Sequence, residues 1–238
     1  MEQPSKPDLH GVIVIDKPRG PTSMSMVNLV RRKCSKVKTG HAGTLDPLAT
    51  GVLVLGVGKM TKRLGQMMDT PKRYTTVIDL SATTAGHDSE SPREEIAVDV
   101  PPTCEEMQAA VATFSGEIMQ APPIFSAVKV NGHRAYAVAR KGKEVKLEPR
   151  KATVHSIAVV QYEWPLVTID IACAKGFYVR SLARDLGKKL CTGGYCTEIR
   201  RTEVGKFTLA LAQQLEHLPE FLTQDDLLSP DQVSDLLG

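Results

Sequence analysis

A single carboxylate stands in a stretch of sequence that is rich in residues that shape the backbone. Residues 40–51 read GHAGTLDPLATG, with Asp46 near the centre, three glycines and a proline directly after the aspartate. Glycine permits backbone angles and close approaches that other residues do not, and proline fixes its own φ. A carboxylate held in such a rigid loop could do chemistry if a positive partner kept it ionised and aimed. An Asp-Pro pair also forms ordinary turns, so this stretch alone leaves both interpretations open.

Two other segments hold side chains that could serve such a carboxylate. Tyr74 follows Lys72 and Arg73, and an enzyme that modifies RNA needs a flat side chain against an extruded base. Arg180 lies in the segment KGFYVRSL, where an expected strand meets a helix, and flanks the apolar stripe of that helix. A guanidinium in that position is rarely left unpaired. The structural alternatives are a tyrosine of the core or sheet and an arginine in solvent.

Strands and helices in no regular alternation must position these side chains. Apolar runs, alternation and turn signals predict strands at residues 12–15, 52–57, 72–81, 116–130, 153–164, 166–173 and 194–207. Helical spacing predicts one helix that begins at Thr22 or Ser23 and others at residues 60–68, 105–114, 133–140 and 177–190. The polar segment 83–102 is expected to be a loop. This order favours an α+β fold with a large mixed, mainly antiparallel sheet flanked by helices.

The helical spacing also predicts which side chains face inward. In residues 177–190 the apolar positions follow an i, i+3, i+4, i+7, i+11 pattern, so Arg184 and Lys188 are expected to point toward solvent or phosphate. In residues 60–68, Leu64, Met67 and Met68 are expected to face the core.

Length and composition are those of an ordinary water-soluble globular protein. The chain has 238 residues, of which 42% are hydrophobic and 24% charged, and no apolar run approaches the length of a membrane span. We expect a cytoplasmic protein with a flexible N-terminus (1–10), one catalytic domain (11–207) and a short, helical, acidic tail (208–238). The five cysteines are scattered and lack the paired spacings of zinc sites, so we expect neither disulfides nor a metal site.

Positive charge is concentrated in the body of the chain. Three basic groupings occupy residues 17–38, 129–151 and 175–206, and no lysine or arginine follows Lys206. Each grouping could be an ordinary solvated face. Three in one chain with few aromatic residues favour a polyanionic partner that is bound through its phosphates.

At several of these positions the chain resembles the TruB-type tRNA pseudouridine synthases. The matching segments occur in the order of that family and are spread over most of residues 11–207. They are the Asp-Lys-Pro of residues 16–18 with Gly20 and Ser23, the block GHAGTLDPLATGVL (40–53), Lys-Arg-Tyr (72–74), Tyr136 with its basic neighbours, and Gly-Phe-Tyr-Val-Arg (176–180).

This resemblance implies a pseudouridine synthase fold that isomerises uridine 55 in the T-loop of tRNA without a metal or cofactor. It implies that Asp46 is the catalytic aspartate, that Tyr74 stacks on the target base and that Arg180 pairs with Asp46. It also implies that His41 helps to hold the flipped nucleotide. The resemblance further implies that Lys17 and Pro18 support the active-site wall and that Tyr178 lines the pocket. Asp88 is implied to contact the extruded nucleotides.

The expected partner is the T-arm of tRNA, and a monomer without an obligatory protein partner or membrane attachment is expected. Only about thirty residues follow Phe207, too few for the C-terminal RNA-binding PUA domain of many bacterial relatives. Three alternatives remain: a tRNA-folding chaperone without catalysis, a synthase for another structured RNA, and a glycoside hydrolase. The last would need two well-placed carboxylates, and the sequence offers one.

The basic grouping at residues 129–151 generates a prediction about RNA binding. Simultaneous neutralisation of Arg140, Lys141 and Lys143 should weaken tRNA binding and reduce its salt dependence. With fewer phosphate contacts, fewer counterions are released from the tRNA on binding. Filter binding across a range of salt concentrations measures the slope, and single-turnover kinetics should show little change after binding. An unaltered salt slope would remove this segment from the interface.

Overall fold

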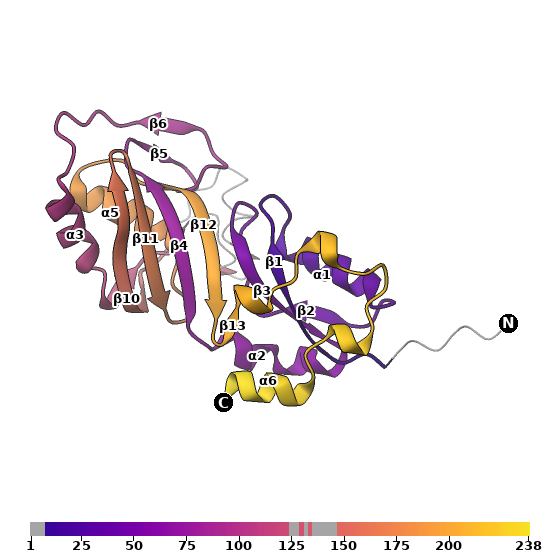
Figure 1. Cartoon of the computed structure of the whole chain (residues 1–238). Helices are drawn as coiled ribbons and strands as arrows, with labels where there is room; N and C mark the ends of the chain where they lie inside the picture. Colours follow the sequence, from indigo (N-terminus) through magenta and orange to yellow (C-terminus); the bar gives the residue numbers. More distant parts are fainter. Residues whose placement is uncertain (1–7, 124–128, 131–132, 135–146) are drawn as a thin grey trace. The chain divides into compact units, whose positions relative to one another are not determined.

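The computed structural model describes residues 8–123, 129–130, 133–134 and 147–238, and the chain divides into two compact units (Figure 1). Unit 1 comprises Met1–Arg73 and Arg200–Gly238, and unit 2 comprises Tyr74–Ile199. Both ends of the chain therefore belong to the same unit. The predictions for residues 1–7, Tyr136, Arg140, Lys141 and Lys143 lie outside the described residues.

Strand β3 (Thr50–Val57) is the centre of unit 1. It pairs antiparallel with β1 (Gly11–Lys17) and β2 (Thr39–His41), and its first residues pair parallel with the end of β12 (Tyr195–Val204). Nearly every residue of β1 and β3 is buried, which explains why both appear as continuous apolar runs in the sequence. The strands predicted at 12–15 and 52–57 are confirmed.

Helix α1 (Ser23–Lys33) begins and ends as its sequence predicts. The side chain of Thr22 accepts a hydrogen bond from the backbone N–H of Ser25. The charged side chains of the last turn are all basic, and they interact favourably with the negative end of the helix dipole. A 3₁₀ helix at Gly58–Arg63 then leads into α2 (Leu64–Met68).

The prediction for the side chains of α2 is right for Leu64 and Met67 and wrong for Met68, since Leu64 packs against buried residues of unit 1. Met67 is buried, whereas Met68 is 45% exposed. The 3₁₀ segment has about three residues per turn, so a continuous helical wheel over residues 60–68 assigns the wrong face to Met68.

The acidic tail is built into unit 1. After β13 (Phe207–Thr208) it forms three 3₁₀ turns, at Leu209–Leu211, Leu215–His217 and Gln224–Asp226, and then α6 (Pro230–Leu237). Leu228 exchanges two backbone hydrogen bonds with Val12, and Val233 of α6 joins the buried cluster that includes Val14, Val54 and Phe207. The domain boundary at residue 207 stays a prediction, although the residues after it contribute to this core.

Unit 2 is a sheet covered by helices. Its strands follow the order β12-β4-β11-β10-β7, with β4 at Lys72–Asp79, β7 at Gly116–Gln120, β10 at Arg150–Glu163 and β11 at Leu166–Cys173. Helix α3 (Cys104–Ala112) packs on β10 and on α5 (Val179–Leu190). The strands predicted at residues 153–164 and 166–173 are confirmed as β10 and β11, which pair antiparallel up to Glu163 and Leu166. With its mainly antiparallel pairing, the chain has the predicted α+β fold.

Two local predictions in this half of the chain are wrong. The segment 83–102 is not entirely loop, because β5 (Ala82–Thr84) and β6 (Arg93–Glu95) pair within it. The helix predicted from residue 133 does not begin there, because β8 (Lys129–Val130) pairs with β9 (His133–Arg134). Residues 135–140 of that prediction lie outside the described residues. None of the described helices is long and apolar enough to span a membrane.

The contribution of the tail to the core can be measured. Val233→Ala should lower the free energy of unfolding by about 2 kcal/mol, because Val233 is fully buried and its loss leaves a cavity. The matched control is Phe221→Ala in the same tail, since Phe221 is 62% exposed and its removal should cost less than about 0.5 kcal/mol. Urea denaturation of both variants measures the free energy of unfolding. Equal losses of this free energy would mean that α6 does not stabilise unit 1.

Candidate active site

The loop that carries Asp46 connects β2 to β3 in unit 1 and is closed by a turn. The backbone N–H of Ala49 donates to the carbonyl of Asp46 at 3.1 Å, with Pro47 at the position where a fixed φ favours the turn. Asp46 itself is half-buried. The turn interpretation of the Asp-Pro pair is therefore correct for the backbone.

Lys17, the last residue of β1, holds the C-terminal half of this loop. Its side chain is fully buried, and its ammonium donates to the carbonyls of Pro47 at 3.1 Å and Ala49 at 2.7 Å, and to that of Pro18 at 2.9 Å. A buried ammonium needs such acceptors to offset its lost hydration. Lys17 thus contacts the residues that follow Asp46 directly, and its support of an active-site wall stays a prediction.

Ser23 holds the residue that precedes Asp46. Its hydroxyl donates to the carbonyl of Leu45 at 2.9 Å and accepts from the N–H of Leu45 at 2.8 Å. Ser23 is the first residue of α1, so the helix start is tied to the loop.

Arg201 of β12 contacts the same loop from its N-terminal side, and the sequence did not reveal this role. The side chain is 1% exposed, and its guanidinium donates to the carbonyls of Gly43, Thr44 and Val52. In the sequence Arg201 is one of two adjacent arginines in a strand, and alternation alone does not say which of the two faces inward.

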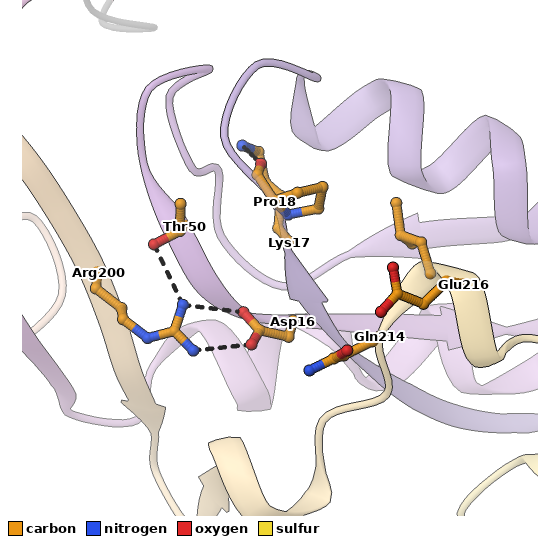
Figure 2. A pocket seen from close by; sticks show the side chains of 8 residues that line it. Asp16, Lys17, Pro18, Thr50, Arg200, Gln214 and Glu216 are labelled. Atoms are coloured by element: carbon orange, nitrogen blue, oxygen red, sulfur yellow. Dashed lines mark hydrogen bonds and ion pairs between the residues drawn. The ribbon is translucent and has the colours of Figure 1, made fainter.

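Its neighbour Arg200 points to the other side of the strand, toward a pocket of about 230 Å³ (Figure 2). Arg200 donates to both oxygens of Asp16, at 3.2 and 2.8 Å, and to the hydroxyl of Thr50 at 3.4 Å. The three residues belong to β12, β1 and β3, so this ion pair ties neighbouring strands of unit 1 together. The pocket is lined by Asp16, Lys17, Pro18, Thr50, Arg200, Gln214, Leu215 and Glu216.

His41, at the end of β2, is half-buried, and its Nδ1 atom has no hydrogen-bond partner among the described residues. Burial lowers the pKa of His41 below its ordinary value, and the charge of Arg201 lowers it further. The imidazole is therefore neutral at pH 7. A neutral ring can offer one donor and one acceptor to a nucleotide, but it adds no positive charge.

In unit 2, Arg180 and Asp88 form a buried ion pair. The guanidinium Nη1 lies 3.0 Å from Asp88 Oδ2, both side chains are 6% exposed, and Nη1 also donates to the carbonyl of Gly86. Thr84 holds the Asp88 backbone through its hydroxyl, which accepts from the N–H and donates to the carbonyl of Asp88. This pair was not predicted. The predicted pair of Arg180 with Asp46 would join the two units and stays a prediction.

Tyr178 is the residue directly before α5, and its backbone is held by Gln120. The amide of Gln120 accepts from the N–H of Tyr178 at 2.8 Å and donates to its carbonyl at 3.0 Å. Gln120 is 2% exposed and was not singled out in the sequence. Tyr74, the third residue of β4, is half-buried.

The prediction that Arg184 points to solvent or phosphate is wrong. Its guanidinium donates to both oxygens of Asp185, at 2.8 and 3.0 Å, and to the carbonyl of Ala121. The side chain is 16% exposed. The carboxylate of the next residue turns the long side chain back onto the protein surface, an effect that a helical wheel does not describe.

The proposed site residues thus form two groups. Unit 1 contains Lys17, His41 and Asp46. Lys17 is linked to the Asp46 loop through the loop carbonyls. Tyr74, Asp88, Tyr178 and Arg180 belong to unit 2. Within the described ranges, no group of three or more histidine, cysteine or acidic side chains could hold a metal ion.

Comparison with known proteins assigns the chain to a family. The model of the TruB family pseudouridylate synthase N-terminal domain matches residues 31–179, and that of the tRNA pseudouridylate synthase B C-terminal domain matches residues 180–236. These matches place the chain in the class of pseudouridylate synthases. Within that class it belongs to the TruB family, as its motifs predicted.

Curated relatives support this assignment over most of their length. The chain is 46% identical over 220 residues to tRNA pseudouridine synthase B of Arthrobacter sp. (strain FB24). This match covers 90% of this chain and 72% of the relative. It is 38% identical to the protein of the same name from Parabacteroides distasonis, of which it covers 94%.

Solved structures agree with the fold. A chain of a Cbf5-Nop10-Gar1 complex has a TM-score of 0.69 and 30% identity, covering 87% of this chain and 53% of that one. A chain of an H/ACA RNP bound to a substrate RNA that contains 2′-deoxyuridine has a TM-score of 0.66 and 28% identity, covering 87% and 52%. This chain therefore spans about half the length of those two proteins.

A half-buried histidine in unit 2 should make stability depend on pH. Burial, and then the charges of Arg184, Arg180 and Lys188, lower the pKa of His87 to about 4 from a usual 6.5. Between these pH values the unfolded chain binds a proton that the folded chain does not, so the free energy of unfolding falls as the pH is lowered through this window. Because the ring is partly solvated, we expect a loss of only about 1 kcal/mol.

His87→Asn should remove this pH dependence. His87 has a positive φ of 56°, which asparagine tolerates better than most residues. Chemical denaturation of wild type and variant between pH 4.5 and 7 measures the slope, with exposed His155→Asn as the control. Identical slopes for wild type and His87→Asn would show that His87 does not titrate as stated.

Proposed function

We propose that this chain isomerises uridine 55 in the T-loop of tRNA to pseudouridine, with Asp46 as the catalytic carboxylate. Membership of the TruB family and the tRNA pseudouridine synthase B relatives support the reaction and its tRNA substrate. Position 55 and the role of Asp46 come from the family resemblance of residues 40–53. We further propose that the enzyme acts in the cytoplasm as a monomer without a protein partner.

The observation that carries the role of Asp46 is the way its loop is held. Side chains from three different elements, Lys17, Ser23 and Arg201, bind the backbone on both sides of the aspartate. An ordinary turn does not need three buried polar side chains to fix it. A catalytic carboxylate does, because it must be held within about 0.5 Å of its productive position.

The reaction breaks the bond between C1′ and N1 of uridine, turns the uracil in the pocket and joins C1′ to C5. N1 gains a proton and C5 loses one, so the product is an isomer of the substrate. Asp46 would act either as a nucleophile at C1′ or as a base at C2′, and both roles require the ionised carboxylate in a fixed orientation.

The residues of unit 2 have supporting roles in this proposal. Tyr74 stacks on the uracil and assists proton transfer at C5, and Tyr178 lines the pocket. Arg180 orients the catalytic carboxylate. The ion pair of Arg180 with Asp88 supports an orienting role, because a buried guanidinium with fixed partners keeps one position.

RNA binding would use exposed basic side chains on unit 1. Arg31, Arg32 and Lys36 lie at and beyond the end of α1 and are exposed. Such side chains bind phosphates without reading the base sequence, and they help to offset the few kcal/mol that extrusion of the target nucleotide costs. Lys17 and His41 are proposed to support the pocket wall and the flipped nucleotide.

Asp46→Asn should abolish pseudouridine formation while the chain still binds tRNA. Asparagine keeps the size of the side chain but can act neither as nucleophile nor as base, so we expect the rate to fall by at least about 10⁴-fold. Tritium release from tRNA that contains [5-³H]uridine measures the reaction, and filter binding measures affinity. Asp225→Asn in the tail is the control and should react like wild type.

Two outcomes would contradict the proposal in different ways. If wild type binds tRNA but releases no tritium, the chain acts as a tRNA-folding chaperone. If a tRNA that carries cytidine at position 55 still releases tritium as fast as the normal tRNA, the enzyme modifies a different uridine.

A further inference from the structure

Arg201 brings a positive charge into the interior of unit 1, where backbone carbonyls surround it. Its guanidinium donates to the carbonyls of Val52 at 2.8 Å, Gly43 at 3.2 Å and Thr44 at 3.4 Å. Among the residues that the structure describes, no carboxylate oxygen lies within ion-pair distance of it. A buried charge of this kind is costly, because the guanidinium gives up its hydration for carbonyl dipoles alone.

We propose that Arg201 is a positioning residue for the catalytic carboxylate. Gly43 and Thr44 lie three and two residues before Asp46, so the guanidinium fixes the N-terminal half of the loop. Lys17 fixes the C-terminal half through Pro47 and Ala49. The inference rests on the proposed function, because it concerns the orientation of Asp46.

The shape of the guanidinium explains why this position holds an arginine. Its nitrogen atoms lie in one plane and point in different directions, so one side chain reaches three carbonyls. A lysine would carry the same charge on a single atom and could not hold Val52 and Gly43 in the same geometry.

The backbone of β12 is also held close to the loop. Gly51 has a φ of 99°, and a Cβ atom there would lie 2.1 Å from the carbonyl oxygen of Arg201. Gly51 therefore permits the contact between β3 and β12 that brings the Arg201 side chain next to the Asp46 loop. The missing side chain of Gly51 is thus part of what places Arg201 at the loop.

Three variants test the role of Arg201. Arg201→Lys keeps the charge and removes the fork, and Arg201→Met removes the charge and keeps most of the volume. Arg63→Lys is the matched control: Arg63 is a half-buried arginine of unit 1 that donates to Gln66, Ser234 and the carbonyl of Pro230. Each variant is measured for its single-turnover rate with saturating tRNA, its tRNA affinity and its thermal unfolding.

We expect the single-turnover rate to fall about 10-fold in Arg201→Lys and about 100-fold in Arg201→Met, with tRNA affinity changed less than about threefold. Arg63→Lys should lose less than about twofold in rate. If Arg201→Met does not fold, Arg201→Lys decides. An unchanged rate in folded Arg201→Lys, or an equal loss in Arg63→Lys, would overturn the proposal.

Hydrogen exchange separates this proposal from the proposed function. Amides of residues 42–49 should exchange at least about tenfold faster in Arg201→Lys than in wild type, and at the wild-type rate in Arg63→Lys. Unchanged exchange of this loop would overturn the positioning role whatever the activity. Faster exchange in a protein whose wild type makes no pseudouridine would support the role of Arg201 on the loop and reject the proposed function.

Discussion

Hydrogen bonds from buried cations to backbone carbonyls are the interaction on which the candidate site depends. Lys17 and Arg201 reach the loop around Asp46 from two strands of unit 1 and bind residues on opposite sides of the aspartate. Backbone contacts of this kind fix the path of the chain and therefore the direction of the side chain between them. Removal of either cation would leave several buried carbonyls without donors, a cost that a change at the surface does not have.

Unit 2 holds its residues by different means. Asp88 neutralises Arg180 directly, so this buried arginine is compensated by a charge, whereas Arg201 is compensated by dipoles. Gln120 fixes the backbone of Tyr178 through a neutral amide. In both units the side chains with proposed chemical roles are thus held by partners far away in sequence, which makes the two sets of contacts products of the fold and not of local structure.

The sequence predicted the features that depend on local chemistry. The helix start at Thr22, the buried strands β1 and β3 and the rigid Asp46 loop follow from capping, apolar runs and backbone-shaping residues. Arg201, Gln120 and the pair of Arg180 with Asp88 were not predicted, because each depends on contacts between distant segments. Arg184 and Met68 were predicted wrongly, since an ideal helical wheel includes neither an adjacent carboxylate nor a change from 3₁₀ to α-helix.

The choice of dipoles as partners for Arg201 has an electrostatic consequence for the loop. A carboxylate partner would cancel the charge, whereas carbonyl groups orient around it and leave its field in place. At the neighbouring His41, burial lowers the pKa, and the charge of Arg201 lowers it further. A positive charge beside the loop also favours the approach of RNA phosphates. Arg201 therefore combines two effects that are usually supplied by separate residues: it holds the backbone of the Asp46 loop, and it brings a positive charge to the residues beside that loop.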